Sequence, residues 1–238
     1  MKRDVLLDVR HLNAFYGRAQ VLFDLSIHLY PGEVVALLGR NGAGKTTTLK
    51  AIMGLISATA THGTFKGHSL GKLPTYKIAR LGLGYVPEDR RIFTDLTVDE
   101  NLETGRREAA AGRAPWTPER LFRLFPNLAE MRGRRGNQMS GGEQQMLTIA
   151  RTLMGNPACI LLDEPSEGVA PVIVDQMAAA IRELKAAGVA ILLSEQNLHF
   201  ATEVADRAYI IEKGRIRFSG TMAELSANAE AQQQYLAV

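Results

Sequence analysis

The chain has 238 residues, which is enough for one large domain or two small ones with a substantial buried core. Hydrophobic residues make up 46% of the sequence and charged residues 22%, and this balance excludes intrinsic disorder and a fibrous repeat. The formal net charge is only +3 and the basic residues are spread thinly, so the sequence gives little support for nucleic-acid binding.

The apolar runs and the cysteine content indicate where such a chain works. The longest apolar runs, such as residues 34–38 and 189–193, fall far short of the roughly 20 residues that a membrane-spanning helix needs. Asp8 interrupts the apolar residues near the N-terminus, so no secretory signal is predicted. Cys159 is the one cysteine and can form no internal disulfide, and we therefore expect a reducing cytoplasm around the protein.

The first third of the chain is predicted to be rich in strands. Apolar patterns bounded by turn residues indicate strands at residues 6–15, 21–30, 34–38, 63–66 and 84–86. Pro31-Gly32 forms a turn before the third of these strands, and Gly71 and Pro74 interrupt the segment between the last two.

The middle of the chain is predicted to be helical. Thr97 and Glu100 have the spacing of a capping box, which marks a helix start. Prolines divide the following segment into short pieces, at Pro115, Pro118 and Pro126. We interpret residues 97 to about 137 as a small helical insert, which together with the next helix gives an α-helical subdomain over about residues 97–155 of a single domain, 1–238.

The last third alternates strands with helices. Strands are predicted at residues 159–162, at 189–193 and on both sides of Lys213-Gly214. One intervening helix begins near Pro171 and has an apolar face made of Ile173, Met177, Ile181 and Leu184. Thr221 caps a last short helix, and we expect the polar tail at 230–235 to be loosely docked. This alternation predicts an α/β fold with a largely parallel sheet.

Residues 39–46 match the phosphate-loop pattern G-x-x-x-x-G-K-[ST], known as Walker A, between a predicted buried strand and a helix. The glycines let successive N–H groups surround phosphate oxygens, Lys45 brings a positive charge to the β and γ phosphates, and Thr46 can hold a magnesium ion. The substrate is therefore expected to be a nucleoside triphosphate. We expect it to contact Gly39, Arg40, Asn41, Gly42, Ala43, Gly44, Lys45, Thr46 and Thr47.

Two acids follow the predicted strand at 159–162. Asp163 is expected to serve the magnesium ion, because hard cations take oxygen ligands. Glu164 is expected to act as the base that polarises the attacking water. The alternative, that both acids merely open a solvent-exposed turn, is weaker beside a phosphate loop.

The predicted helix start at Ser140 is a second candidate site for binding an anion. Ser140 and Glu143 have capping-box spacing, and Gly141 and Gly142 are expected to leave the free N–H groups of the helix uncovered. An ordinary capped helix is the alternative interpretation.

These motifs, together with the signature segment at residues 139–145 (MSGGEQQ), resemble the ATP-binding subunit of an ATP-binding cassette (ABC) transporter along nearly the whole chain. The resemblance implies a P-loop NTPase core, an antiparallel β subdomain and a small α-helical subdomain. It also implies binding of ATP and Mg²⁺, with Tyr16 stacked on the adenine. Ser140, Gly141 and Gly142 would bind the γ-phosphate of an ATP held by the opposite subunit.

The chain departs from the common family pattern at three positions. Glu88 stands where many members carry Gln, Gln196 where they carry a switch His, and Ala170 where they carry an acid. Glu88 can still reach a metal-bound water and is a candidate metal ligand with Thr46 and Asp163. Gln196 cannot become charged near neutral pH, and it is a candidate catalytic residue beside Lys45 and Glu164.

The segments that contain these departures resemble the shorter ATPase subunit of bacterial branched-chain amino acid importers. They are residues 85–93, 165–171 and 195–197. Glu167 fits related urea and amide importers as well. The resemblance implies an ATPase at the cytoplasmic face of the inner membrane. Its implied partners are a second ATPase subunit, two membrane permeases and, indirectly, a periplasmic binding protein, without nucleic acid. Residues 88–93 and the helical insert would form the groove for a permease helix.

Two other classes remain as alternatives. A metabolic P-loop kinase or GTPase is disfavoured by the signature segment and by the absence of an Asn-Lys-x-Asp motif. A soluble ABC ATPase acting on nucleic acid or ribosomes would resemble paired cassettes or a cassette split by a coiled coil, and 238 residues hold neither.

Overall fold

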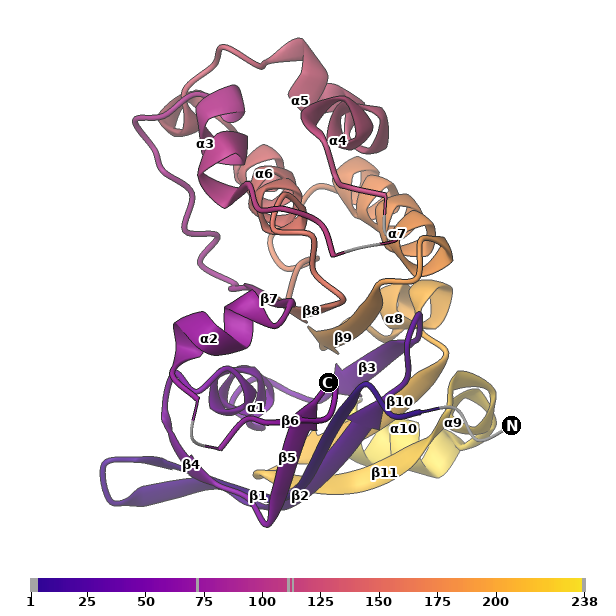
Figure 1. Ribbon diagram of the computed structural model, residues 1–238. Coiled ribbons are helices and arrows are strands. Elements are labelled where there is room, and N and C mark those ends of the chain that lie inside the picture. Colours follow the sequence, from indigo (N-terminus) through magenta and orange to yellow (C-terminus); the bar gives the residue numbers. More distant parts are fainter. Residues whose placement is uncertain (1–3, 72, 111, 113, 237–238) are drawn as a thin grey trace.

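Two β-sheets organise the chain in this computed structural model, which describes residues 4–236 apart from 72, 111 and 113 (Figure 1). The six-stranded sheet has, in spatial order, β11 (Arg215–Thr221), β10 (Arg207–Glu212), β3 (Val34–Leu38), β9 (Ala190–Glu195), β8 (Cys159–Asp163) and β7 (Leu83–Val86). All neighbours from β10 to β7 run parallel, and only the edge strand β11 is antiparallel. The predicted parallel sheet is therefore confirmed.

The second sheet is antiparallel and packs at the opposite side of the molecule from most helices (Figure 1). Its strands are β2 (Ala19–Leu29), β1 (Leu7–Tyr16), β5 (His62–Phe65) and β6 (His68–Ser69), with β4 (Ser57–Thr59) also paired to β1. The sequence did not reveal β4 and β6, because strands of three and two residues show no readable alternation.

Helices cover both faces of the six-stranded sheet. Helix α1 (Lys45–Ile52) lies between the two sheets, where Leu49 joins a core with Leu22 of β2 and Leu37 of β3. The opposite face packs against α3 (Val98–Gly105), α4 (Pro118–Leu124), α5 (Pro126–Glu130), α6 (Gly141–Leu153) and α7 (Pro171–Ala186). The remaining helices are α2 (Thr75–Arg80), α8 (Leu198–Val204), α9 (Met222–Ala227) and α10 (Ala229–Tyr235), with a 3₁₀ turn at Gly136–Gln138.

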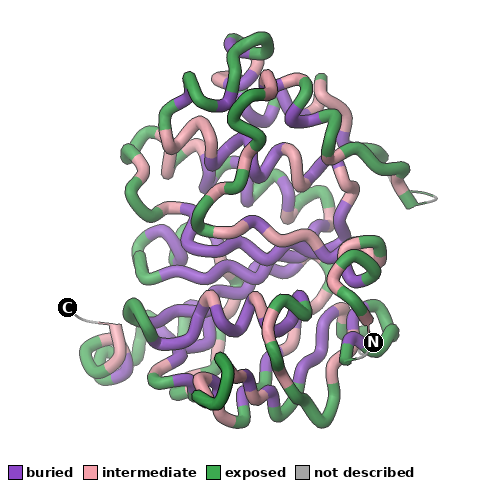
Figure 2. The backbone as a smooth tube through the Cα atoms, turned by 90° about the vertical axis from the view of Figure 1, so that its left-hand side faces the viewer, coloured by how far each residue is buried: buried purple, intermediate pink, exposed green. Residues whose placement is uncertain are grey.

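Burial on both faces explains why the central strands are continuous apolar runs. Every residue of β3, β8 and β9 is buried, and Figure 2 shows this buried layer crossing the middle of the molecule. Along β3, Val35 and Leu37 face the core around α1, whereas Ala36 and Leu38 face α8 and α9. Parallel strands with this packing bring their carboxyl ends to one edge of the sheet.

The loop after β7 is fastened to the helical region by a buried amide. Asn101 of α3 is fully buried, and its side chain both accepts from Phe93 N and donates to Phe93 O, each at 2.9 Å. The same amide nitrogen donates to the carbonyls of Leu96 and Thr97. Thr97 forms the predicted capping box with Glu100 at the start of α3.

The C-terminal tail differs from the expectation of loose docking. Residues 229–235 form α10, with Ala231 buried against β10 and α9. Asn228 caps this helix by accepting from Ala231 N at 2.9 Å, and Gln232 donates to Leu225 O at 2.8 Å. Among the described residues, no helix has the length and apolarity needed to cross a bilayer.

Candidate functional site

The carboxyl ends of three adjacent strands place most of the predicted site residues together. The phosphate loop follows β3, Asp163 ends β8 with Glu164 directly after it, and Gln196 follows β9. Because β9 lies between β3 and β8, residues more than 100 positions apart along the sequence become neighbours, and Thr46 and Asp163 share a hydrogen bond.

The phosphate loop needs glycine for two physical reasons. Gly42 and Gly44 have φ angles of 77° and 114°, in the left-handed region that side chains disfavour. Gly39 faces a different constraint, because a Cβ there would lie 2.5 Å from Ile211 O. The loop backbone is therefore packed too closely against β10 and the loop that follows it for larger residues.

Lys45 is buried at the centre of the site, with 3% of its surface exposed. Its ammonium donates to the carbonyls of Gly39 at 2.7 Å and Arg40 at 3.2 Å. It also forms an ion pair with Glu164 Oε1 at 3.1 Å. The candidate phosphate-binding cation and the candidate base thus contact each other directly.

Asp163 is fully buried and accepts three hydrogen bonds from hydroxyl groups. Oδ1 accepts from Thr46 at 2.9 Å and from Ser194 at 2.7 Å, and Oδ2 accepts from Tyr85 at 2.9 Å. Burial, together with the Asp163 charge, raises the pKa of Tyr85 far above its usual value, so the phenol remains a donor. These contacts fix the orientation of the carboxylate.

Thr46 and Asp163 fit a magnesium ion. Mg²⁺ is usually bound by one or two side-chain oxygens together with waters and substrate phosphates. A hydroxyl and a carboxylate 2.9 Å apart beside a phosphate loop provide such a set. The described residues contain no cluster of three or more acidic, His or Cys side chains that would form an all-protein metal site.

Glu164 has an unusual backbone and a partly unsatisfied carboxylate. Its φ angle is 45°, and its N–H donates to Ser194 O at 3.1 Å and Ser194 Oγ at 3.2 Å. Such left-handed non-glycine residues are strained and occur often at functional sites. The buried Oε2 accepts from no N–H or hydroxyl group among the described residues.

Two further acids lie near Glu164. A hydrogen bond with Glu164 is the largest cause that raises the pKa of Glu167 to about 7, and burial and the Glu164 charge add to it. Two carboxylates can bond only through a shared proton, which explains the direction of this shift. Glu88 is exposed and raises the pKa of Glu167 further by its charge, so it lies at the edge of the same acidic group.

Gln196 is exposed just beyond β9, and its neighbour Glu195 is buried. Glu195 Oε1 accepts from Ser166 N at 3.1 Å, and Oε2 accepts from Asn197 N at 3.3 Å. Burial raises the pKa of Glu195. This carboxyl joins the segment after Glu164 to the segment that carries Gln196.

The helix start at Ser140 lies apart from the phosphate loop. Ser140 and Glu143 form the predicted capping box, with Ser140 N donating to Glu143 Oε2 at 2.7 Å. Ser140 is exposed, and α6, which begins after it, lies in the helical region away from α1, which follows the phosphate loop (Figure 1). On the Cβ side of the two glycines that follow Ser140, the Arg90 side chain lies next to Gly141, and Val169 and Ile173 lie next to Gly142.

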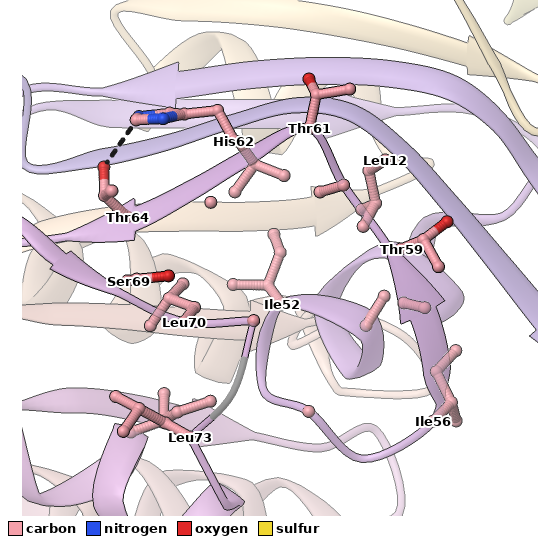
Figure 3. A pocket seen from close by; sticks show the side chains of 18 of the residues that line it. Leu12, Ile52, Ile56, Thr59, Thr61, His62, Thr64, Ser69, Leu70 and Leu73 are labelled. Atoms are coloured by element: carbon pink, nitrogen blue, oxygen red, sulfur yellow. Dashed lines mark hydrogen bonds between the residues drawn. The ribbon is translucent and has the colours of Figure 1, made fainter.

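Tyr16 ends β1 and is 46% exposed, so its ring is accessible to a planar ligand. A separate cavity of about 500 Å³ lies between the end of α1, β4 and β5. Figure 3 shows its apolar interior, with Ile52 and Leu70, and a polar rim where Thr64 Oγ1 and His62 Nε2 are 3.2 Å apart. None of its lining residues is among the predicted nucleotide contacts.

Sequence reasoning missed Tyr85, Ser194 and Glu195. The last two stand directly after the predicted strand at 189–193, and a polar pair at the carboxyl end of a parallel strand was the available signal. Tyr85 gave no such signal, because an aromatic residue within a strand usually serves packing.

Comparison with known proteins agrees with this geometry. The family model described as ABC transporter matches residues 22–167. BraG of Pseudomonas aeruginosa, a high-affinity branched-chain amino acid transport ATP-binding protein, is 41% identical over 97% of this chain and 99% of its own. LptB of Haemophilus influenzae, a lipopolysaccharide export system ATP-binding protein, is 34% identical over 97% of both chains.

Solved structures agree in fold. The structure of an ATP binding subunit of an ABC transporter superposes with a TM-score of 0.80 at 29% identity, covering 97% of this chain and 96% of its own. An ATP-binding cassette in its ADP conformation gives a TM-score of 0.78 at 26% identity, covering 94% of each chain. The sheet order, the phosphate loop and these similarities lead to one conclusion: the chain belongs to the ABC transporter family, as an ATP-binding subunit that hydrolyses ATP.

Proposed function

We propose that the chain powers the import of branched-chain amino acids from the cytoplasmic face of the inner membrane, as one of two ATPase subunits beneath two permeases. A periplasmic binding protein would deliver the cargo. The observation that carries the cargo assignment is the 41% identity to BraG, which extends over 97% of this chain and 99% of the relative.

Each candidate residue has a role in this proposal. Lys45 and the phosphate-loop N–H groups hold the β and γ phosphates, and Tyr16 stacks on the adenine. Thr46 and Asp163 hold Mg²⁺, with Glu88 reaching it through water; the ion, when bound, neutralises charge on the phosphates. Glu164 accepts the proton of the attacking water, and Gln196 orients that water beside the γ-phosphate.

Closure of two subunits completes the site. Ser140, Gly141 and Gly142 of one subunit bind the γ-phosphate held by the phosphate loop of the other. A helix N-terminus with free N–H groups is a suitable anion site, and Ser140 is exposed to receive it. Hydrolysis removes this shared phosphate and allows the pair to reopen, which moves the permeases.

The permease is proposed to dock between the α-helical subdomain, at about 97–155, and the loop after β7. A cavity of about 370 Å³ lies there, lined by Tyr85, Phe93, Thr104 and Arg151 among others. Phe93 is 51% exposed, and the Arg151 guanidinium lies 5.0 Å from the centre of its ring. An exposed aromatic side chain held by a cation provides an apolar anchor for a helix end.

Lipopolysaccharide export is a second candidate, because LptB proteins are 34–35% identical over 97% of this chain. Import of urea or short amides is a third, because Glu167 stands where such importers have a similar residue. A soluble role with nucleic acid or ribosomes has no supporting relative among those described above.

Uptake measurements in cells that lack this chain would decide between these cargoes. We expect loss of labelled leucine, isoleucine and valine uptake, restored by the parent chain and not by Glu164→Gln. Unchanged amino acid uptake with lost urea or amide uptake would reassign the cargo. Defective lipopolysaccharide delivery to the outer membrane would replace import by export. In either case, hydrolysis by the purified subunit would remain as the family predicts.

A further inference from the structure

The loop after β7 is held against the signature helix α6 by side chains of that helix. Thr148 Oγ1 donates to Arg90 O at 2.7 Å, and Arg151 Nη2 donates to Arg91 O at 2.6 Å. Arg90 and Arg91 have φ angles of 64° and 49°, so two consecutive residues occupy the strained left-handed region. Arg90 is therefore fixed in place relative to α6.

The Arg90 side chain lies on the first residue of α6. A Cβ added to Gly141 would be 2.4 Å from Arg90 Nη1, 2.9 Å from Cζ and 3.0 Å from Nη2. The guanidinium thus occupies the space that any other residue at 141 would fill. The φ angle of Gly141 is not in the left-handed region, so the glycine matters here for the space that it leaves to the guanidinium.

This position places a cation on the positive end of a helix. The first N–H groups of α6 have no intrahelical acceptors and carry part of the helix dipole. Among the described residues, the Arg90 guanidinium has no ion pair or hydrogen bond to offset this repulsion. The nearby acids are engaged elsewhere, because Asp89 binds Arg91 at 2.8 Å and Glu143 caps Ser140. The arrangement calls for an anion at this surface.

We propose that Arg90 binds, in trans, the γ-phosphate that Ser140, Gly141 and Gly142 receive from the opposite subunit. This inference rests on the composite site of the proposed function. A guanidinium can donate two parallel hydrogen bonds to phosphate oxygens, which neither a hydroxyl nor a backbone N–H can do alone. Glu88, two residues earlier, belongs to the subunit's own site, so one short loop contacts both ATP molecules of the closed pair.

Sedimentation velocity with MgATP tests this assignment in a Glu164→Gln background, where hydrolysis is blocked. Arg90→Ala should weaken MgATP-driven association about tenfold or more. Arg90→Lys should weaken it less, because lysine keeps the positive charge but lacks the two parallel N–H donors of the guanidinium. Arg91→Ala is the matched control. The Arg91 side chain is next to Arg90 in the sequence, but it is exposed and pairs with Asp89, so its removal should not change association. Calorimetry on dilute subunits should give the same MgATP affinity for all variants.

Two results would overturn the assignment. One is Arg90→Ala that associates as tightly as its parent; the other is an equal loss of MgATP affinity in the dilute subunit. If the Glu164→Gln subunit does not self-associate in the presence of MgATP, two copies of this chain do not form the closed pair. The decisive measurement is then hydrolysis by the tagged transporter purified with its partner chains. There Arg90→Ala should lower kcat about tenfold with unchanged permease recovery, whereas lost permease with normal kcat per complex would place Arg90 at the permease.

Discussion

The Lys45–Glu164 pair predicts a measurable coupling between stability and ATP binding. The ammonium and Oε1 are 3.1 Å apart, and the two side chains are 2% and 6% exposed. At an effective dielectric constant of about 20, two charges at that separation attract by about 5 kcal/mol, and desolvation offsets part of this. Removing one partner of such a buried pair typically costs about 3–5 kcal/mol.

Lys45→Met should therefore destabilise the protein by about 3 kcal/mol, because Glu164 is left buried beside another acid, Glu167. Glu164→Gln should cost less, because Lys45 keeps its bonds to the carbonyls of Gly39 and Arg40. The double variant Lys45→Met/Glu164→Gln should lose about 2 kcal/mol less unfolding free energy than the sum of the two single variants, since no unpaired charge remains in it.

Urea unfolding of the four proteins, without nucleotide, measures this coupling as a double-mutant cycle. A coupling below about 0.5 kcal/mol, the level of an exposed pair, would refute the reasoning. The Glu164 carboxylate also competes with the phosphates of the nucleotide for Lys45. Glu164→Gln should accordingly bind MgATP several-fold more tightly than the parent, and equal or weaker binding in calorimetry would contradict the competition.

Three further predictions concern single residues. Gln196→Ala should lower kcat for ATP hydrolysis at least tenfold with nearly unchanged ATP affinity in steady-state and binding assays, and an affinity loss alone would exclude a role at the γ-phosphate. Because the folded-state pKa of Glu167 is raised to about 7, the stability contributed by its proton is lost as the pH rises through 7. Glu167→Gln should gain stability relative to the parent between pH 5 and 8, and a pH-independent difference would disprove the shared proton. Burial raises the pKa of the Cys159 thiol to about 12, so Ellman's reagent should label it at pH 8 only after unfolding, and rapid native labelling would contradict its burial.

Much of the architecture could be predicted from the sequence because the local signals were strong. The fully buried strands β3, β8 and β9 were predicted from apolar runs, and the capping-box spacings at Ser140 and Thr97 predicted the starts of α6 and α3. The phosphate loop followed from the spacing of its glycines, from Lys45 and Thr46, and from its place between a strand and a helix. Parallel strands then bring such motifs to one sheet edge, so the grouping of Lys45 with Asp163 also followed.

The remaining features depend on packing between distant segments. Nothing in the local sequence shows that Tyr85 reaches Asp163, or that Arg90 lies on Gly141, since these contacts span 78 and about 50 residues. The tail was misjudged because polarity was read as loose attachment. In fact one small buried residue, Ala231, the Asn228 cap and the hydrogen bond from Gln232 to Leu225 O hold α10 in place.

Asn101 gives the docking region a mechanical property. Its buried amide binds both the N–H and the carbonyl of Phe93 as well as the carbonyl of Thr97, so the segment from Phe93 to Thr97 is tied to α3 at both ends. If a permease helix docks on Phe93 as proposed, a push on that residue would be passed to α3 through the Asn101 amide. The segment between β7 and Phe93 carries both Glu88 and Arg90, and side chains of α6 hold its carbonyls at Arg90 and Arg91. Under the proposed docking, a displacement of Phe93 would therefore act on the signature helix α6 as well as on α3.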